Sequence, residues 1–288
     1  MFSIIIPTWN NLKYLDTCIK SLIRNSKYKH QIIVHVNEDT DNTREYLDKI
    51  SIEYTYTSYN AGICEGVNLA SKKSKFDYIL YSHDDFYFCP NWDTEFINEV
   101  KDIKHNNFYL SSTMIGYVGE NSLNCGDNID NFNEDKLLDK FHTIPFKDFQ
   151  GSTWAPHLIH KSVWNKVGGF SEEFFPGSGS DPDLNKKLWD VGIRIFKGLS
   201  KSRVYHFGSK TLRREKNIFG SRGAKLFHLK WGFSINFFKK FYLNSMELYN
   251  GPLKEPKKNL AYLYSYAIDR IKYFYIKYIY NINKKLKI

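Results

Sequence analysis

Three consecutive residues, His83, Asp84 and Asp85, are the side chains of this sequence with the clearest capacity for chemistry. They follow the run YILYS, whose composition is typical of a short buried strand, and Pro90 comes soon after them. A turn that leaves both carboxylates in water is one explanation. The other is a cation site, because two oxygen ligands on a rigid strand end suit Mg²⁺ or Mn²⁺, and such ions usually accompany a phosphate-bearing substrate.

A second acidic pair, Asp181 and Asp183, follows a loop rich in glycine and serine, GSGSDPDLNKKLW. Asp181 stands where a helix N-cap would be and Pro182 at the first helical position, so the pair could simply start a helix. Two acids after a glycine-rich approach are also typical of a loop that faces a ligand. Both interpretations stay open on these residues alone.

Further candidates follow in the second half of the chain. His206 ends the predicted strand VYHF, where it could bind a ligand or simply bond to backbone. Lys210, Arg213 and Arg214 come next and form either a phosphate clamp or a solvated basic turn. Trp154, in GSTWAPH, could be the floor under a sugar or a core residue.

Strands and helices alternate in the first part of the chain, which predicts an α/β fold with a mostly parallel sheet. The predicted strands are Phe2–Ile6, Gln31–Val36, Tyr54–Thr57 and Tyr78–Tyr81, and the predicted helices begin near Leu12, Arg44 and Gly62. Ligands collect at the carboxyl ends of such strands, so we expect Thr8, Glu38, Asn60 and Asp85 to converge. The stretches LSSTMIGY, HTIPFKD and GSTWAPHLIHK predict a more irregular, partly antiparallel region, and RIFKG with SRVYHFGSKT predicts a last strand.

Composition limits the class of protein. The chain has 288 residues, 42% of them hydrophobic and 25% charged, which is enough for a full globular core. Its net charge of +10 suggests a polyanionic partner, but nine basic and two acidic residues lie from Lys254 onward, and no nucleic-acid reader motif accompanies them. The four cysteines are far apart, and the N-terminus has no basic leader, so we expect reduced thiols and a cytoplasmic protein that binds no nucleic acid.

The tail KKNLAYLYSYAIDRIKYFYIKYIYNINKKLKI has apolar residues spaced by three or four and predicts one or two amphipathic helices. A basic helix rich in tyrosine could lie on the inner face of an anionic membrane. It could also pack on the rest of the chain or on a second copy in a homodimer.

Four motifs in one order resemble family-2 glycosyltransferases of the GT-A fold: SIIIPTWN, NAGICEGVNLA, YILYSHDDF, and VGGFSEEFFPGSGSDPDLNKKLW leading to VYHFGS. The resemblance covers about residues 2–231. It implies a Rossmann-like, mixed and mostly parallel sheet flanked by helices. The catalytic domain would span residues 1–215, with a nucleotide-binding half to about 100 and an acceptor-binding half after it. Residues 216–288 would form a helical C-terminal extension.

The resemblance also assigns roles to single residues. The HDD stretch matches an Asp-x-Asp element with His83 in place of the first acid, so Asp85 would bind the metal and Asp84 the ribose. The SDPD stretch matches a Glu-Asp element with Ser180 in place of the acid, so Asp181 would be the general base. The other assignments are Pro7, Thr8, Asn10, Glu38 and Asn60 for the nucleotide sugar, His206 for the metal, and Trp154 and Asp183 for the acceptor.

These roles imply an inverting transferase that moves a sugar, most simply from a UDP-sugar, to a hydroxyl of a saccharide or lipid-linked acceptor with the help of Mn²⁺ or Mg²⁺. A catalytically silent carbohydrate-binding relative is the alternative, because both acidic elements lack their first acid. A sugar-1-phosphate nucleotidyltransferase is a weaker alternative. Its glycine-rich, arginine-containing loop after the first strand is replaced here by PTWNN.

Overall fold

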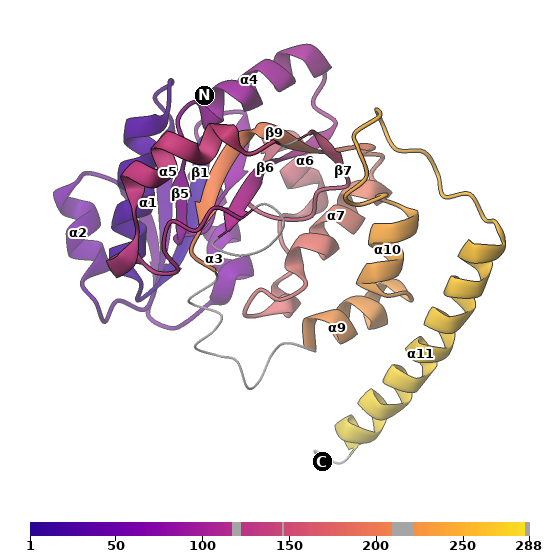
Figure 1. Ribbon diagram of the computed structural model, residues 1–288. Helices are drawn as coiled ribbons and strands as arrows, with labels where there is room; N and C mark the ends of the chain where they lie inside the picture. Colours follow the sequence, from indigo (N-terminus) through magenta and orange to yellow (C-terminus); the bar gives the residue numbers. More distant parts are fainter. Residues whose placement is uncertain (117–121, 146, 209–221, 286–288) are drawn as a thin grey trace.

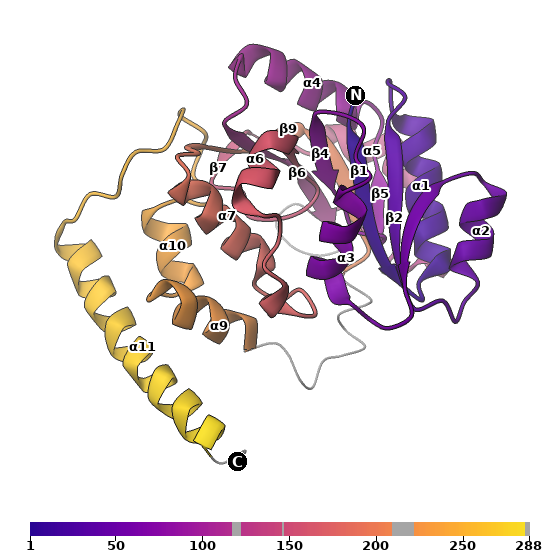
Figure 2. The same cartoon turned by 180° about the vertical axis from the view of Figure 1, so that it is seen from behind.

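One mixed sheet forms the centre of the molecule, and helices cover both of its faces (Figures 1 and 2). The computed structural model describes the chain except residues 117–121, 146, 209–221 and 286–288, and the side chains of residues 281–285. The described strands are β1 Ser3–Trp9, β2 Gln31–Asn37, β3 Glu53–Thr57, β4 Tyr78–Tyr81, β5 Phe86–Phe88, β6 Phe108–Gly116, β7 Phe149–Gln150, β8 His157–His160 and β9 Ile195–His206.

Helices connect these strands or follow them. The described α-helices are α1 Leu12–Asn25, α2 Thr43–Lys49, α3 Gly62–Ser71, α4 Trp92–Ile103, α5 Glu134–Lys140, α6 Lys161–Val167, α7 Ser180–Asp190, α9 Arg222–Trp231, α10 Ile235–Phe241 and α11 Leu260–Lys285. Single 3₁₀ turns lie at Ile129–Asn131, Phe141–Thr143 and Glu172–Phe174.

The first half of the sheet is parallel, as the sequence predicts. Strands β3, β2, β1 and β4 lie side by side in that order. In β1 the residues Ile4, Ile5 and Ile6 are fully buried, because helices cover the strand on both faces and leave no face for polar side chains. The amphipathic helix α1 buries Leu15, Ile19 and Leu22 against this layer.

The second half of the sheet mixes directions. Strand β8 lies antiparallel between β4 and β6, β9 runs parallel to β6, and β5 and β7 pair antiparallel with β9. Six of the nine described strands therefore run in one direction, namely β1, β2, β3, β4, β6 and β9. The predicted α/β class and the mixed, mostly parallel sheet flanked by helices are confirmed.

Two local predictions differ from the structure. The described residues of HTIPFKD form no strand, because residues 141–143 form a 3₁₀ turn and pairing begins only with β7. Asp181 is not the N-cap of α7 but lies inside its first turn. Gly179 precedes the helix with a positive φ of 85°, a conformation that glycine adopts without steric cost, and the helix starts two residues earlier than the predicted N-cap at Asp181 implies.

The C-terminal segment begins in the hydrophobic core and ends in a helix that is largely exposed. Phe227 of α9, Phe238 of α10 and Leu253 are buried in the same core as the sheet. The predicted tail forms one helix, α11, which leaves this core and projects along one side of the molecule in both views (Figures 1 and 2). Among the described residues, no helix is long and apolar enough to cross a membrane.

Candidate active site

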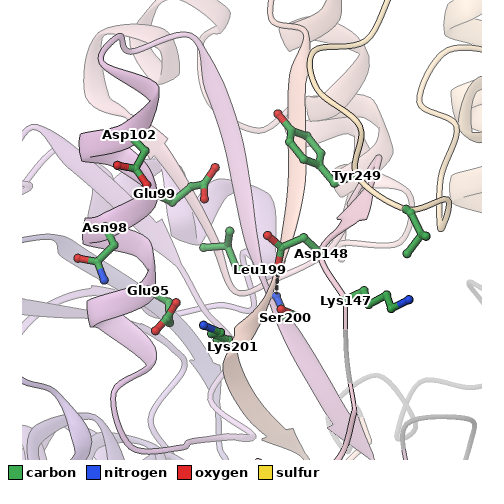
Figure 3. A pocket seen from close by; sticks show the side chains of 11 residues that line it. Glu95, Asn98, Glu99, Asp102, Lys147, Asp148, Leu199, Ser200, Lys201 and Tyr249 are labelled. Carbon is green, nitrogen blue, oxygen red and sulfur yellow. Dashed lines mark hydrogen bonds between the residues drawn. The ribbon is translucent and has the colours of Figure 1, made fainter.

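An acidic hollow between α4 and the β7–β9 edge contains none of the predicted site residues (Figure 3). Its walls include Glu95, Glu99 and Asp148. Lys197 neutralises part of this charge, since its Nζ lies 2.7 Å from a Glu99 carboxylate oxygen and 3.0 Å from one of Asp148. Two of the acids around the hollow, Glu99 and Asp148, are thus paired with a lysine of the protein itself.

The predicted nucleotide-binding residues meet at the carboxyl ends of β1, β2 and β4. The Thr8 hydroxyl donates to an Asp84 carboxylate oxygen at 2.7 Å, so the loop after β1 is tied to the HDD stretch. Asn37, at the end of β2, donates to the Thr8 carbonyl and accepts from the amide of Ala61. The side chain of Asn60 caps the amide of Gly62 at the start of α3. Sequence reasoning did not identify Asn37 as the residue that connects Thr8 to Ala61. A polar residue at the end of an apolar strand is the signal that could have found it.

Glu38 joins the loops after β1 and β2. Its carboxylate accepts from the indole of Trp9 at 2.7 Å and from the amide of Asn10 at 3.4 Å. Asn10 and Glu38 both have positive φ, 47° and 54°, a conformation that non-glycine residues adopt mainly where function or tight turns require it. The neighbouring acids have other partners: Asp39 pairs with Arg44, and Asp41 accepts from the first amide of α1. Glu38 is therefore the acid of this loop that contacts Asn10, another residue predicted to bind the nucleotide sugar.

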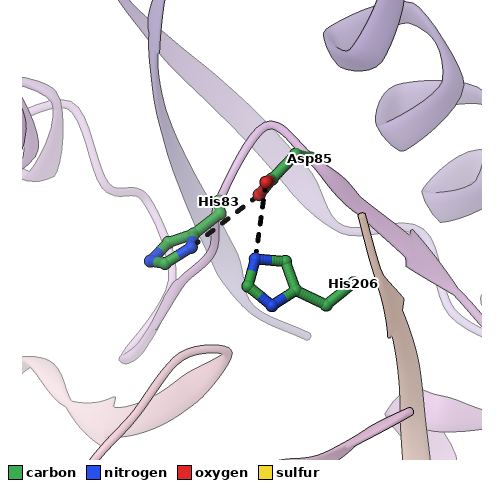
Figure 4. Close-up of side chains that lie close together, drawn as sticks. All are labelled: His83, Asp85 and His206. Atoms are coloured by element: carbon green, nitrogen blue, oxygen red, sulfur yellow. Dashed lines mark ion pairs between the residues drawn. The ribbon is translucent and has the colours of Figure 1, made fainter. Parts of the chain in front are cut away.

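His83, Asp85 and His206 form one cluster, brought together by the end of β4 and the end of β9 (Figure 4). The Asp85 carboxylate lies 3.9 Å from His83 Nδ1 and 3.4 Å from His206 Nε2. All three possible ligand atoms lie within 4.8 Å of one another. Burial lowers the pKa of His83 to about 4, so its imidazole is neutral at pH 7 and able to bind a metal. Two imidazoles and a carboxylate are a donor set that fits a divalent transition metal.

Sequence reasoning did not name His83 as a candidate metal ligand. The family pattern has an acid at this position, and its replacement suggests a weakened site. The structure instead directs the His83 ring toward Asp85 and stacks it on Phe86 at a centroid distance of 4.8 Å. The signal was present in the residue type, since histidine is itself a common metal ligand.

Asp181 lies in a region with few polar partners. Its Oδ1 is enclosed and has no hydrogen-bond partner among the described residues. His157 Nδ1 is 4.0 Å from this oxygen, too far for a hydrogen bond, and lies 3.0 Å from the Tyr109 hydroxyl. Burial lowers the pKa of His157 to about 3, so this ring carries no charge to balance Asp181. Burial also raises the pKa of Asp181 to about 7, a value suited to a general base.

Asp181 and the His83–Asp85–His206 cluster lie at the same end of the sheet. His157 pairs in register with Tyr81, the last residue of β4, and His83 follows two residues later. The rings of Tyr81 and His157 lie 5.1 Å apart. Sequence reasoning did not place His157 and Tyr109 near Asp181, because both belong to strands and nothing in their spacing distinguishes them from core residues.

Asp183 is fully buried and its carboxylate is engaged within the protein. It accepts from Ser171 at 2.6 Å and from the Trp231 indole at 2.8 Å, and it pairs with Lys230 at 3.0 Å. These contacts hold α7 against α9. The geometry therefore favours a structural role for Asp183 over the predicted contact with an acceptor.

Trp154 is partly exposed and one of its faces is covered. Its ring stacks on Phe149 at 5.1 Å with an interplanar angle of 17°, and its indole donates to the Ser112 carbonyl. A sugar would therefore have to use the other face. Pro7 continues β1 in register opposite His35, between the apolar run and Thr8. The predicted clamp residues Lys210, Arg213 and Arg214 lie outside the described residues.

The family follows from a match to the sequence model described as glycosyl transferase family 2, which covers residues 3–152, more than half of the chain. The chain belongs to this family. The matched part of this family-2 glycosyltransferase contains the HDD stretch and both loops that meet at Glu38. Asp181 and His206 lie beyond it.

Curated relatives share the region but are longer proteins. A chondroitin synthase of Pasteurella multocida is 25% identical over 238 residues, covering 71% of this chain and 24% of its own length. A chondroitin synthase of Escherichia coli is 24% identical, with 34% of its length covered. An uncharacterised glycosyltransferase of Rickettsia prowazekii is 28% identical, with 64% covered. The chain thus spans about a quarter to a third of the length of the two synthases.

Solved structures agree on the fold. Residues 1–349 of Staphylococcus aureus TarS superpose with a TM-score of 0.55 at 16% identity, covering 71% of this chain and 60% of that one. The same TarS fragment was also solved with UDP-GlcNAc, and GalNAc-T7, solved with UDP, GalNAc and Mn²⁺, matches with a TM-score of 0.54 at 14% identity. At these identities the likeness establishes the GT-A fold.

Proposed function

We propose that the chain is an inverting glycosyltransferase that moves a sugar from a UDP-sugar to a hydroxyl of a saccharide or lipid-linked acceptor. One observation carries the proposal. A histidine–carboxylate cluster and an aspartate with one enclosed oxygen and a raised pKa lie at the same end of one sheet, in a family-2 chain. Sugar transfer needs both elements, one beside the leaving diphosphate and the other beside the attacking hydroxyl.

The donor would lie along the loops after β1 and β2. Pro7, Thr8 and Asn10 would line the nucleotide, with Asn60 nearby at the start of α3, and Glu38 would accept a hydrogen bond from the base. A carboxylate acceptor suits uracil, whose ring N–H is a donor. The similarity to TarS, which was solved with UDP and with UDP-GlcNAc, supports the choice of UDP.

Asp85, His206 and His83 would hold a divalent cation, and Asp84 would contact the ribose while Thr8 fixes its orientation. A bound cation would neutralise the charge that develops on the departing diphosphate. The two imidazole donors favour Mn²⁺ over Mg²⁺, because Mg²⁺ prefers oxygen ligands and gives up its waters reluctantly. The solved complex of GalNAc-T7 with Mn²⁺ supports the same choice.

Asp181 would accept the proton of the acceptor hydroxyl as that oxygen attacks the anomeric carbon. A base with a pKa near 7 is strong enough to help at neutral pH and is about half ionised there, and such catalysis typically contributes about 10²–10⁴-fold. The exposed face of Trp154 would support the acceptor sugar through its C–H groups.

The cytoplasmic location and a homodimer remain predictions.

A donor screen tests the proposal. Purified protein is incubated with a panel of nucleotide sugars and Mn²⁺, Mg²⁺ or a chelator, and thermal stability and nucleoside diphosphate release are measured. We expect one UDP-sugar to raise the melting temperature only with metal, more with Mn²⁺, and to be hydrolysed slowly. If no donor binds under any condition, the replaced acids at His83 and Ser180 indicate a silent relative.

A further inference from the structure

The C-terminal helix α11 carries an apolar stripe on the side that faces away from the protein. The stripe, called the outer stripe here, consists of Leu260, Tyr264, Ile271, Phe274, Tyr275 and Tyr278. These side chains recur at helical spacing and are 60% to 85% exposed. Soluble monomers rarely expose apolar side chains in such a continuous row, so the outer stripe needs a partner.

The opposite side of α11 already has its partner. Tyr262 is 7% exposed and packs on Phe237 of α10 with ring centroids 5.1 Å apart. Asp269 is 6% exposed, and its carboxylate accepts from both the amide and the hydroxyl of Ser234 at 2.7 Å. His228 of α9 bonds to the Asp269 carbonyl. These contacts set the rotation of the helix and direct the outer stripe away from the domain, so packing on the catalytic domain does not account for it.

The charges around the outer stripe are all positive. Lys272 and Lys277 are exposed, and helical geometry places them on opposite flanks of the stripe. Lys257 and Lys258 are exposed just before the helix. Asp269 is the single acid between residues 260 and 280, and it is committed to α10. The exposed side of the helix from Leu260 to Tyr280 therefore has basic flanks and no carboxylate.

From this geometry we propose that α11 binds in the plane of an anionic lipid surface, with the outer stripe in the headgroup region and the lysines at lipid phosphates. Tyrosine suits this depth, since its ring is apolar and its hydroxyl remains hydrated. A second copy of the chain fits less well. Two such stripes would bring lysine against lysine, with no acid on either exposed face to pair with them.

Vesicle flotation of the full chain, without any donor, tests this inference separately from sugar transfer. We expect binding to phosphatidylcholine vesicles that contain phosphatidylglycerol, weaker binding to phosphatidylcholine alone, and loss of binding as salt is added. Ile271→Glu should weaken binding about tenfold or more, because it removes an apolar contact with the lipid and adds a negative charge that anionic headgroups repel. Lys272→Gln should weaken it about fivefold.

Ile23→Glu is the matched control. Ile23 lies on α1 and is 63% exposed, close to the 71% of Ile271, so the same chemical change there should leave vesicle binding unchanged. Equal flotation of wild type and Ile271→Glu would overturn the inference, as would absence of binding by the wild type. A wild-type dimer in sedimentation equilibrium that Ile271→Glu dissociates, without vesicle binding, would assign the stripe to a second copy instead.

Discussion

At the scale of single residues, the two acidic stretches divide into side chains that face the proposed substrate and side chains that hold the framework. Asp181 has an Oδ1 with no hydrogen-bond partner among the described residues, whereas Asp183, two positions later, is buried among Ser171, Trp231 and Lys230. Neighbours in sequence thus serve different ends, which their residue types could not reveal.

His83 should contribute directly to metal-dependent nucleotide binding. His83→Ala removes one of three nitrogen or oxygen ligands, so we expect Mn²⁺-dependent UDP binding to weaken about tenfold or more. His83→Asp exchanges a nitrogen donor for oxygen and should shift the preference from Mn²⁺ toward Mg²⁺. Calorimetric titration of UDP with each metal measures both effects.

The exposed His105 provides the control. It precedes β6, at the opposite end of the sheet from His206, so His105→Ala removes an imidazole away from the cluster. Its affinity for UDP should equal that of the wild type. Unchanged Mn²⁺-dependent affinity in His83→Ala would remove His83 from the metal site.

The raised pKa of Asp181 predicts two pH dependences. The base acts only when ionised, so kcat/KM should rise about tenfold per pH unit below about pH 7 and level off above it. Folding also raises this pKa above its ordinary value, so the native state keeps a proton that the unfolded chain has lost. The free energy of unfolding should therefore fall as pH rises from about 4 to about 7.

Asp181→Asn isolates the second effect. The amide cannot ionise, so the variant should gain stability over the wild type progressively across this window, which thermal denaturation at several pH values measures. A stability difference that does not change with pH would show that the carboxyl titrates normally.

The acids and the histidine of the candidate site could be selected from the sequence, but the side chains that surround Asp181 could not. Asp181, Asp85 and His206 could be chosen because acids and a histidine end predicted strands or begin a predicted helix. His157 and Tyr109 approach Asp181 only because β8 lies between β4 and β6, a pairing of distant segments that no local pattern encodes. The raised pKa of Asp181 depends on this environment.

At the scale of elements, α3 packs closely on β2 beside the edge of the sheet where we propose that the nucleotide binds. A Cβ added at Gly66 would lie 2.5 Å from the ring of His35, which is fully buried and bonded to Thr55 at 2.8 Å. The ring cannot retreat without losing that bond. The first parallel strands and their helices were predictable from apolar periodicity, whereas HTIPFKD failed because its apolar residues alternate too briefly to define a strand.

Gly66→Ala should lower the free energy of unfolding by about 1–2 kcal/mol, because overpacking costs about 1–3 kcal/mol and helix propensity returns at most about 1 kcal/mol. Chemical denaturation measures the loss. Adding His35→Ala makes room for the new methyl group, so the double variant should be less destabilised than the sum of the two single variants. Strict additivity would contradict a clash between these two positions.

At the scale of the whole molecule, one sheet connects the proposed donor-binding loops, the His83–Asp85–His206 cluster and the proposed base, while α11 carries the outer stripe away from them. The parallel direction of the first strands could be anticipated from strand–helix alternation, but their order was not predicted. The direction in which the tail presents its apolar side could not, since it depends on Tyr262 and Asp269 docking on α10.

The most direct test of the central claim compares donor binding and turnover in wild type and Asp181→Asn, with Mn²⁺, the selected UDP-sugar and a panel of saccharide acceptors. The account predicts equal donor affinity and a turnover at least about a hundredfold lower in the variant. A variant that binds the donor and keeps more than about a tenth of the wild-type kcat would contradict Asp181 as the base, and with it the proposed mechanism.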